Sequence, residues 1–148
     1  MSSFRSFVFD PTLLISQMVA LQSVFYSAQS VSLMAYSLTG YQPSVSHIFT
    51  IQPLRFTALV QLVAAVGVAV AISYLVQRTR QCLDFACTVH LFHLLLVCIY
   101  NATFPTSLLW WLLQLVSVTI CTVLGEYLCT RLESREIKLT NSPSKYDL

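Results

Sequence analysis

The sequence predicts an all-α, polytopic membrane protein: a compact bundle of four transmembrane helices with both termini in the cytosol. Hydrophobic residues make up 56% of the chain and charged residues only 9%, whereas about a quarter of an ordinary soluble domain is charged. The hydrophobic residues gather into four stretches, at about 13–38, 56–77, 83–102 and 107–129. Each stretch is long enough for a transmembrane helix, which needs about 20 residues.

Helices are expected rather than strands, because the bilayer offers no partner to free backbone groups and the alternation of a β-barrel is not seen. Asp10 and Pro11 mark the start of the first helix, as a capping residue and a first helical residue. No charge lies between Asp84 and Glu126, so two helices fit there only if the segment around Pro105 turns.

The chain then divides into three parts. A cytosolic N-terminal segment covers 1–12, the transmembrane domain covers 13–129, and a cytosolic tail covers 130–148 and is expected to be flexible beyond about Leu139. What is left outside the four helices is too short for a soluble catalytic domain.

Lysine and arginine predict the orientation, because short loops rich in these residues stay in the cytosol. Only Arg55 falls on one side of the membrane. The other side holds Arg5, Arg78, Arg80, Arg131, Arg135, Lys138 and Lys145. The N-terminus, the hairpin at Arg78–Cys82 and the tail are therefore expected in the cytosol. A net charge of +2 without a basic cluster gives no sign of nucleic-acid binding.

Small residues at helical spacing predict the faces on which the helices pack. They form a series on three of the four helices: Ser16, Ala20, Ser23, Ser27 and Ser30 on the first, Ala65, Gly67, Ala69, Ala71 and Ser73 on the second, and Ser117, Cys121 and Gly125 on the fourth.

Ionisable residues within a membrane are functional candidates, and here they are Asp84, His90, His93 and Glu126. For the two carboxylates we favour a structural role at the cytosolic boundary, paired with Arg78, Arg80 or Arg131. For the histidines we favour neutral rings that hydrogen-bond across the bundle, for example to Gln114 or to a serine of the first helix.

A metal site and a proton relay are the less favoured alternatives for the histidines. Cys87, His90 and His93 cover one arc of a helix, so two of them could share a metal. The sequence supplies no cluster of further ligands, and we expect no metal or other cofactor.

The remaining candidates lie near the membrane boundaries. Cys82 and Cys129 are placed where a thiol is accessible to palmitoylation, although a plain free thiol is favoured and no structural disulfide is expected. Asn101 begins a glycosylation sequon hard against the membrane, where we expect it to be mostly unmodified. Trp110 and Trp111 suit an interfacial aromatic belt.

Several longer segments resemble one family. Phe4-Arg5-Ser6, Asp10-Pro11 and Ser16-Gln17 are similar to the N-terminus of the SYS family of small, four-span Golgi membrane proteins. The same family pattern is followed by QCLDF at 81–85, TVHLFHLL at 88–95, FPTSLLWWL at 104–112 and GEYLCTRLESREI at 125–137. The resemblance extends to about Leu139.

The resemblance implies a non-enzymatic receptor in the trans-Golgi network membrane, active in Golgi vesicle trafficking and endosome-to-Golgi transport. Its implied partner is an Arf-related small GTPase whose N-terminus is acetylated. The family offers no catalytic residues to transfer, and the sequence shows no nucleophile paired with a base.

The small cytosolic surface leaves few candidates for docking such a GTPase: Arg78, Arg80, Arg131, Glu133 and Glu136. The main alternative function is a small proton-coupled transporter that uses the intramembrane histidines and carboxylates. It is disfavoured because both carboxylates lie near the cytosolic boundary and not at the centre of the membrane.

Overall fold

The computed structural model describes the chain from residue 10 to residue 140, and this part is helical apart from its connections. Four long helices account for most of it: α1 (Pro11–Ser37), α2 (Arg55–Leu75), α3 (Cys82–Asn101) and α4 (Leu108–Thr140). Two single 3-10 turns, η1 (Val45–His47) and η2 (Thr79–Gln81), lie in the connections. The all-α prediction is confirmed for the described residues.

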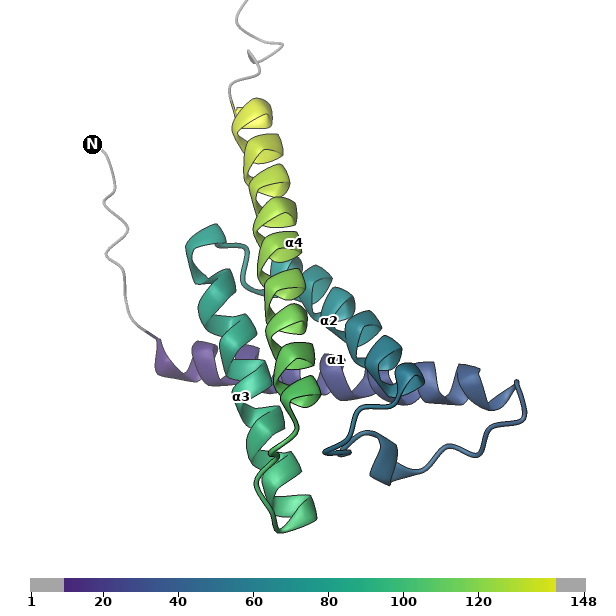
Figure 1. Ribbon diagram of the computed structural model, residues 1–148. Helices are drawn as coiled ribbons and strands as arrows, with labels where there is room; N and C mark the ends of the chain where they lie inside the picture. The colour runs from purple at the N-terminus through teal and green to yellow at the C-terminus, as the bar shows by residue number, and fades with distance from the viewer. Residues whose placement is uncertain (1–9, 141–148) are drawn as a thin grey trace, which may run out of the picture.

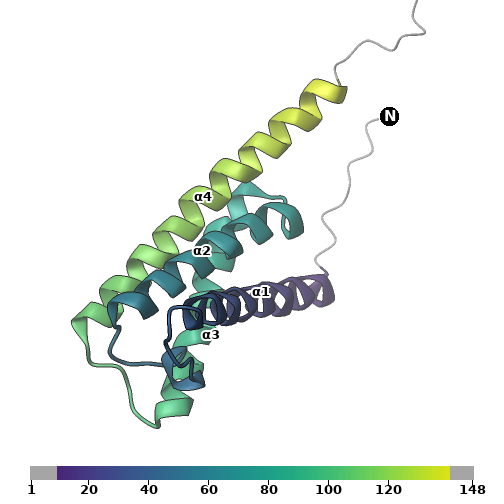
Figure 2. The same ribbon diagram turned by 90° about the vertical axis from the view of Figure 1, so that its right-hand side faces the viewer.

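The four helices do not share one direction. In Figure 1, α1 lies across α3 and α4 at a steep angle and α2 runs diagonally between these directions, while Figure 2 shows α2 running beside α4. α2 packs against both α1 and α4. The segments Arg55–Leu75, Thr79–Asn101 and Leu108–Lys138 are long and apolar enough to cross a membrane. α1 is the fourth long helix. It carries Gln17, Gln22 and Gln29 and is not among these three segments, so a fourth transmembrane span formed by α1 stays a prediction.

The local signals set the start of α1 and the turn between α3 and α4 where the sequence placed them, whereas α4 continues to Thr140, beyond the predicted fourth stretch at 107–129. The Asp10 carboxylate accepts hydrogen bonds from the backbone N–H groups of Thr12, at 3.1 Å, and Leu13, at 3.4 Å, which confirms the predicted start of α1. α3 ends at Asn101, and Ala102 takes a left-handed conformation with φ of 52°. The chain turns there and begins α4 at Leu108, as the proline-containing segment indicated.

The small residues of α2 and α4 do form a seam. Ala65, Ala69 and Ser73 are buried on α2, and so are Ser117, Cys121 and Gly125 on α4. A side chain at Gly125 would meet Cys82 Sγ at 3.7 Å, Ile72 at 3.8 Å and the Ala69 carbonyl at 3.9 Å. The backbones therefore approach closely at this point. Gly67 does the same on the other face of α2, where its Cβ position lies 3.6 Å from Ala28 of α1.

The packing face predicted for α1 is wrong. Its four serines at 16, 23, 27 and 30 are exposed, and the helix instead buries Leu21, Phe25, Gln29 and Leu33. The hydroxyls of two of those serines donate to the backbone carbonyl four residues earlier, at 2.8 Å and 2.9 Å. A serine satisfied by its own helix does not need a neighbouring helix.

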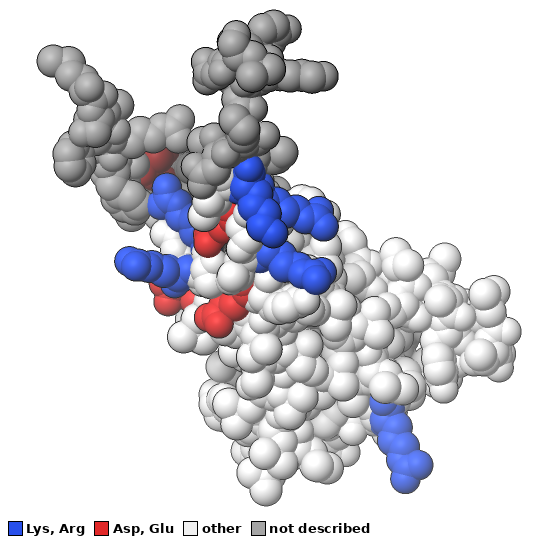
Figure 3. Space-filling model, turned by 90° about the horizontal axis from the view of Figure 1, so that it is seen from above, with Lys and Arg blue, Asp and Glu red and all other residues white. Residues whose placement is uncertain are grey.

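The molecule has two unlike ends. The charged end comprises η2, the start of α3 and the last turns of α4. It carries most of the described charges: Arg78, Arg80, Asp84, Glu126, Arg131, Glu133, Arg135, Glu136 and Lys138. The loop end comprises the 38–54 connection, the 102–107 turn and Arg55. Figure 3 shows most of the basic and acidic side chains gathered at one side, with one basic side chain standing apart on the white remainder of the surface. This uneven distribution is the one on which the predicted orientation rests.

Candidate functional site

The charged end contains a groove between the α2–α3 hairpin and α4. It has a volume of about 590 Å³ and is lined by Arg78, Thr79, Arg80, Gln81, Thr130 and Glu133. Arg78, Arg80 and Glu133 are three of the five residues that the sequence proposed for docking. The other two, Arg131 and Glu136, lie on the same stretch of α4 outside the groove lining; the Arg131 guanidinium sits 5.4 Å from the centre of the Tyr127 ring.

Contacts between the α2–α3 hairpin and α4 hold the two walls of this groove together. The backbone N–H of Thr79 donates to a carboxylate oxygen of Glu133 at 3.4 Å. One turn deeper, the sulfur atoms of Cys82 and Cys129 lie 3.6 Å apart, and both residues are fully buried. The Cys82 thiol also donates to the Arg78 carbonyl at 3.6 Å. These contacts within the chain form the groove without a partner protein.

This geometry corrects the prediction that the two boundary cysteines are accessible. Cys82 and Cys129 are buried free thiols that pack against each other, so neither sulfur is open to a palmitoyl donor in this conformation. The sequence places both cysteines near the membrane boundary, and accessible thiols were expected for that reason. In the fold, the two cysteines are 47 residues apart in sequence but in contact, and this contact buries both thiols.

Asp84 and Glu126 are exposed residues of the charged end, and neither lines the groove. Asp84 lies in the first turn of α3, where a negative charge is favourable next to the helix N-terminus. The two carboxylates are therefore separated from the histidines, which lie deeper along α3.

His90 and His93 are buried against α1. The Nδ1 atom of His93 and the Tyr26 hydroxyl are 3.1 Å apart, and Phe25 packs edge-on to His93 with ring centres 5.3 Å apart. His90 Nδ1 lies 2.9 Å from the Ala86 carbonyl, which can only accept, so the ring carries a proton on Nδ1. The predicted bonding across the bundle to the first helix is thus made by His93, through a tyrosine.

The other partners suggested for the histidines are wrong. The Gln114 amide is buried without a hydrogen-bond partner among the described residues, as is Nε2 of His90. Cys87 is exposed while both histidines are buried, so the three side chains suggested as metal ligands do not lie on one face of the helix in the same surroundings. The described residues contain no group of three or more His, Cys, Asp or Glu side chains placed to hold a metal ion.

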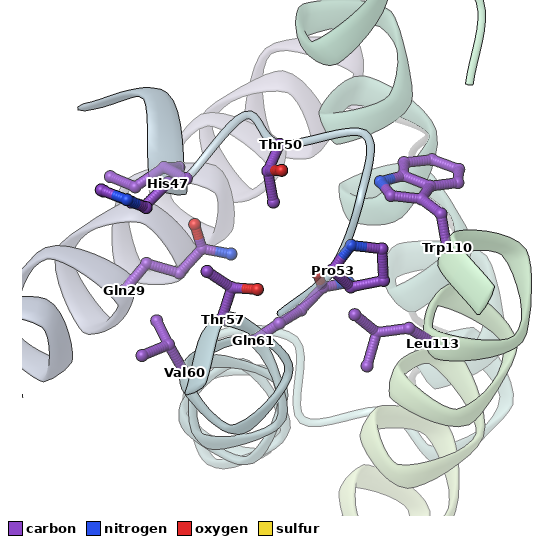
Figure 4. A pocket seen from close by; sticks show the side chains of 10 residues that line it. Gln29, His47, Thr50, Pro53, Thr57, Val60, Gln61, Trp110 and Leu113 are labelled. Carbon is purple, nitrogen blue, oxygen red and sulfur yellow. The ribbon is translucent and has the colours of Figure 1, made fainter. Parts of the chain in front are cut away.

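A second set of buried polar side chains, which the sequence analysis did not predict, lies near the loop end. Figure 4 shows Gln29, Gln61 and Trp110 converging from three helices with Thr50, Thr57 and Pro53 around a small cavity. Its volume is about 10 Å³, the space of a single water molecule. This is far below the several hundred Å³ of a small-molecule site.

Two residues near the loop end bear on earlier expectations. Trp110 is 2% exposed and belongs to the core, so its assignment to an interfacial belt is wrong. The Asn101 amide donates to the carbonyls of Phe49, at 2.7 Å, and Val97, at 2.9 Å. Asn101 of the sequon therefore ties the long loop to α3.

The family model described as an integral membrane protein linking to the trans-Golgi network, SYS1, matches residues 4–139. The chain belongs to the SYS1 family. The SYS1 homolog of Nematostella vectensis is 34% identical over 151 aligned residues, which cover 97% of this chain and 96% of that protein. The SYS1 homolog of Dictyostelium discoideum is 31% identical, over 88% of this chain and 59% of its own length. No solved structure matches.

Family membership confirms the resemblance and the location: the protein is an integral membrane protein of the trans-Golgi network. SYS1 is a family of trafficking proteins and not a known enzyme family. The matched range includes both the charged-end groove and the histidine cluster. Of the two, the groove is the one that is open, lined by donors and acceptors, and large enough for part of another protein.

Proposed function

We propose that this SYS1-family protein is a membrane receptor that recruits an N-terminally acetylated, Arf-related small GTPase to the trans-Golgi network. In this role it supports Golgi vesicle trafficking and endosome-to-Golgi transport. The groove at the charged end carries the proposal, because it brings Arg78, Arg80 and Glu133 together at the end that the bias in lysine and arginine predicts to be cytosolic.

The chemistry of an acetylated N-terminus suits such a groove. Acetylation removes the positive charge of the terminus, so the receptor needs no carboxylate to balance it. What remains is a carbonyl oxygen, which accepts hydrogen bonds from the guanidinium groups of Arg78 and Arg80 or from the amide of Gln81. A short amphipathic helix by itself binds a membrane only weakly, and stable anchoring takes a second signal. A protein groove at the membrane surface provides that second signal.

The acidic residues of α4 have a different role in this proposal. Glu133 lines the groove and Glu136 is exposed on the same helix, so both lie where basic residues of the GTPase surface would approach. Charged pairs at the rim of an interface speed association more than they strengthen the final complex, and salt screens them.

The test is a binding measurement with the full-length protein in lipid nanodiscs, using acetylated and non-acetylated GTPase. Arg80→Ala removes a charge-assisted hydrogen bond worth about 1.5–3 kcal/mol, so affinity for the acetylated form should fall by at least tenfold at all salt concentrations. The double change Glu133→Lys and Glu136→Lys should weaken binding mainly at low salt. Lys138→Ala, on the same helix but outside the groove lining, is the matched control.

Two further variants separate docking from folding. Glu133→Gln keeps an acceptor for the Thr79 N–H while it removes the charge, so the hairpin stays attached to α4 and only the salt-dependent part of binding should change. A binding constant that is unchanged in both the Arg80 and the double glutamate variants would refute this docking face. Equal binding of the acetylated and non-acetylated GTPase would refute the chemistry assigned to the groove.

The transporter alternative has less support. A proton-coupled pathway needs carboxylates or histidines that exchange protons along a line across the membrane. Here Asp84 and Glu126 are exposed at the charged end, while His90 and His93 are enclosed by α1.

A further inference from the structure

A second groove lies at the opposite end of the protein, between the first turns of α2 and of α4. It has a volume of about 370 Å³, and apolar side chains make up nearly all of its lining; those that matter most here are Leu54, Ala58, Leu109, Leu112 and Val116. Arg55 is the single charged residue of the lining. This groove shares Pro53 and Leu113 with the small polar cavity of Figure 4 but opens outward.

The apolar side chains of this groove are poorly covered by the protein. Leu54, Leu109, Leu112 and Val116 are between 48% and 66% exposed. Within a bilayer such a groove is filled by hydrocarbon, and its position between two helices suits part of an acyl chain. The apolar lining alone does not choose among lipids.

Arg55 supplies the selectivity. It is the first residue of α2, is exposed, and lines the groove. All five described acidic residues, Asp10, Asp84, Glu126, Glu133 and Glu136, lie elsewhere in the fold: Asp10 caps α1 and the others belong to the charged end. Within the described part of the chain, the guanidinium therefore has no carboxylate near it.

The start of α2 adds to the positive potential. Leu54 precedes the helix and provides no side-chain cap, so the first N–H groups of α2 are not satisfied by a capping side chain. Unpaired N–H groups at a helix N-terminus favour an anion. Here these N–H groups lie next to the positive charge of Arg55, which lines an apolar groove. A ligand complementary to all three features carries a phosphate attached to a hydrocarbon chain.

We propose that this groove binds an anionic phospholipid of the surrounding membrane, with an acyl chain between α2 and α4 and the phosphate against Arg55. The site is separate from the charged-end groove and does not depend on the proposed receptor role. A zwitterionic phospholipid fits the apolar part equally well, but its own positive group competes with Arg55 for the phosphate. The protein should therefore prefer the anionic lipid.

The proposal can be tested by photo-crosslinking the full-length protein in phosphatidylcholine vesicles. The probe is phosphatidylglycerol with a photoactivatable acyl chain, compared with phosphatidylcholine that carries the same chain. Crosslinked peptides are located by mass spectrometry. We expect crosslinks at 54–58 and 109–116, with a yield several times higher for phosphatidylglycerol. Labelling of peptides from the charged end provides an internal reference for non-specific attraction.

Two variants separate charge from shape. One arginine near a membrane surface contributes about 1 kcal/mol of attraction to anionic lipid, so Arg55→Ala should lower phosphatidylglycerol labelling of the groove about fivefold. Arg55→Lys should restore most of it, which guards against a folding defect. Ala58→Leu fills the groove without altering charge and should reduce labelling by both lipids, and Arg135→Ala at the charged end should leave the groove unaffected. Equal labelling by the two lipids, or undiminished labelling of Arg55→Ala, would overturn the proposal.

Discussion

The close approach of α2 and α3 to α4 at Gly125 gives the sharpest test of the fold. A methyl group at Gly125 would make contacts of 3.7 to 3.9 Å with Cys82, Ile72 and Ala69, which are ordinary van der Waals distances. Gly125→Ala should therefore fit without moving either helix. Alanine is also a better helix former than glycine by about 0.8–1.0 kcal/mol, so this variant should be as stable as the wild type or slightly more stable.

A larger side chain at the same position has no space. Gly125→Leu places further atoms beyond the Cβ position, where the Cys82 sulfur, the Ile72 side chain and the Ala69 carbonyl already lie. Overpacking of this kind costs about 1–3 kcal/mol. It would also push apart the contact between Cys82 and Cys129, which lies one turn further along α4 and supports the docking groove.

The assay is thermal unfolding of the purified protein in detergent, followed by the loss of the monodisperse species. Each kcal/mol shifts the midpoint by roughly 2–4 °C in a chain of this size. Gly125→Leu should lower it by several degrees and should weaken GTPase binding as well. Val123→Leu, on the same helix at a position 61% exposed, is the control and should change little. If Gly125→Ala destabilises the protein as much as Gly125→Leu does, the packing at this seam is wrong.

Three further predictions concern the histidines, the topology and the cysteines. Changing both His90 and His93 to Gln should leave GTPase recruitment largely intact, because glutamine still hydrogen-bonds but does not titrate near neutral pH; loss of recruitment by a folded, Golgi-localised variant would favour a relay. An epitope after Leu148 should be accessible to antibody when only the plasma membrane is permeabilised, and detection only after Golgi membranes are opened would refute the orientation. Cys82 and Cys129 should resist alkylation by a maleimide until the protein is denatured, whereas rapid modification in the native state would contradict the buried thiol pair.

The sequence predicted the helices well because their boundaries depend on local chemistry. A capping carboxylate at Asp10 and a proline at Pro105 act on the backbone within a few residues, so the neighbouring sequence is enough to predict where a helix begins or the chain turns. The long uncharged stretch before Glu126 was likewise divided correctly. The small residues of α2 and α4 also predicted their seam, because close helix approach requires small side chains at that spacing on both partners.

The face of α1 could not be predicted in the same way. Small polar residues at helical spacing have two explanations: they pack against another helix, or they hydrogen-bond to their own backbone. Ser16 and Ser23 do the second. The residues that do pack, such as Phe25 and Gln29, are large, and their partners lie on helices far along the chain. A pattern within one helix does not identify those partners.

The candidate site shows the same limit, because the sequence did not predict which of its residues contact each other. The sequence predicted that the Arg78–Cys82 hairpin and the start of the tail lie on one side of the membrane, which was enough to name three of the six residues that line the groove. It did not show that Glu133 binds the hairpin backbone or that Cys82 meets Cys129. Both contacts lie within about two turns of Gly125 along α4, where α2 and α3 approach α4 closely, so we expect the shape of the docking groove to depend on this glycine. A variant that disturbs that seam should therefore reduce binding even though every groove residue is still present.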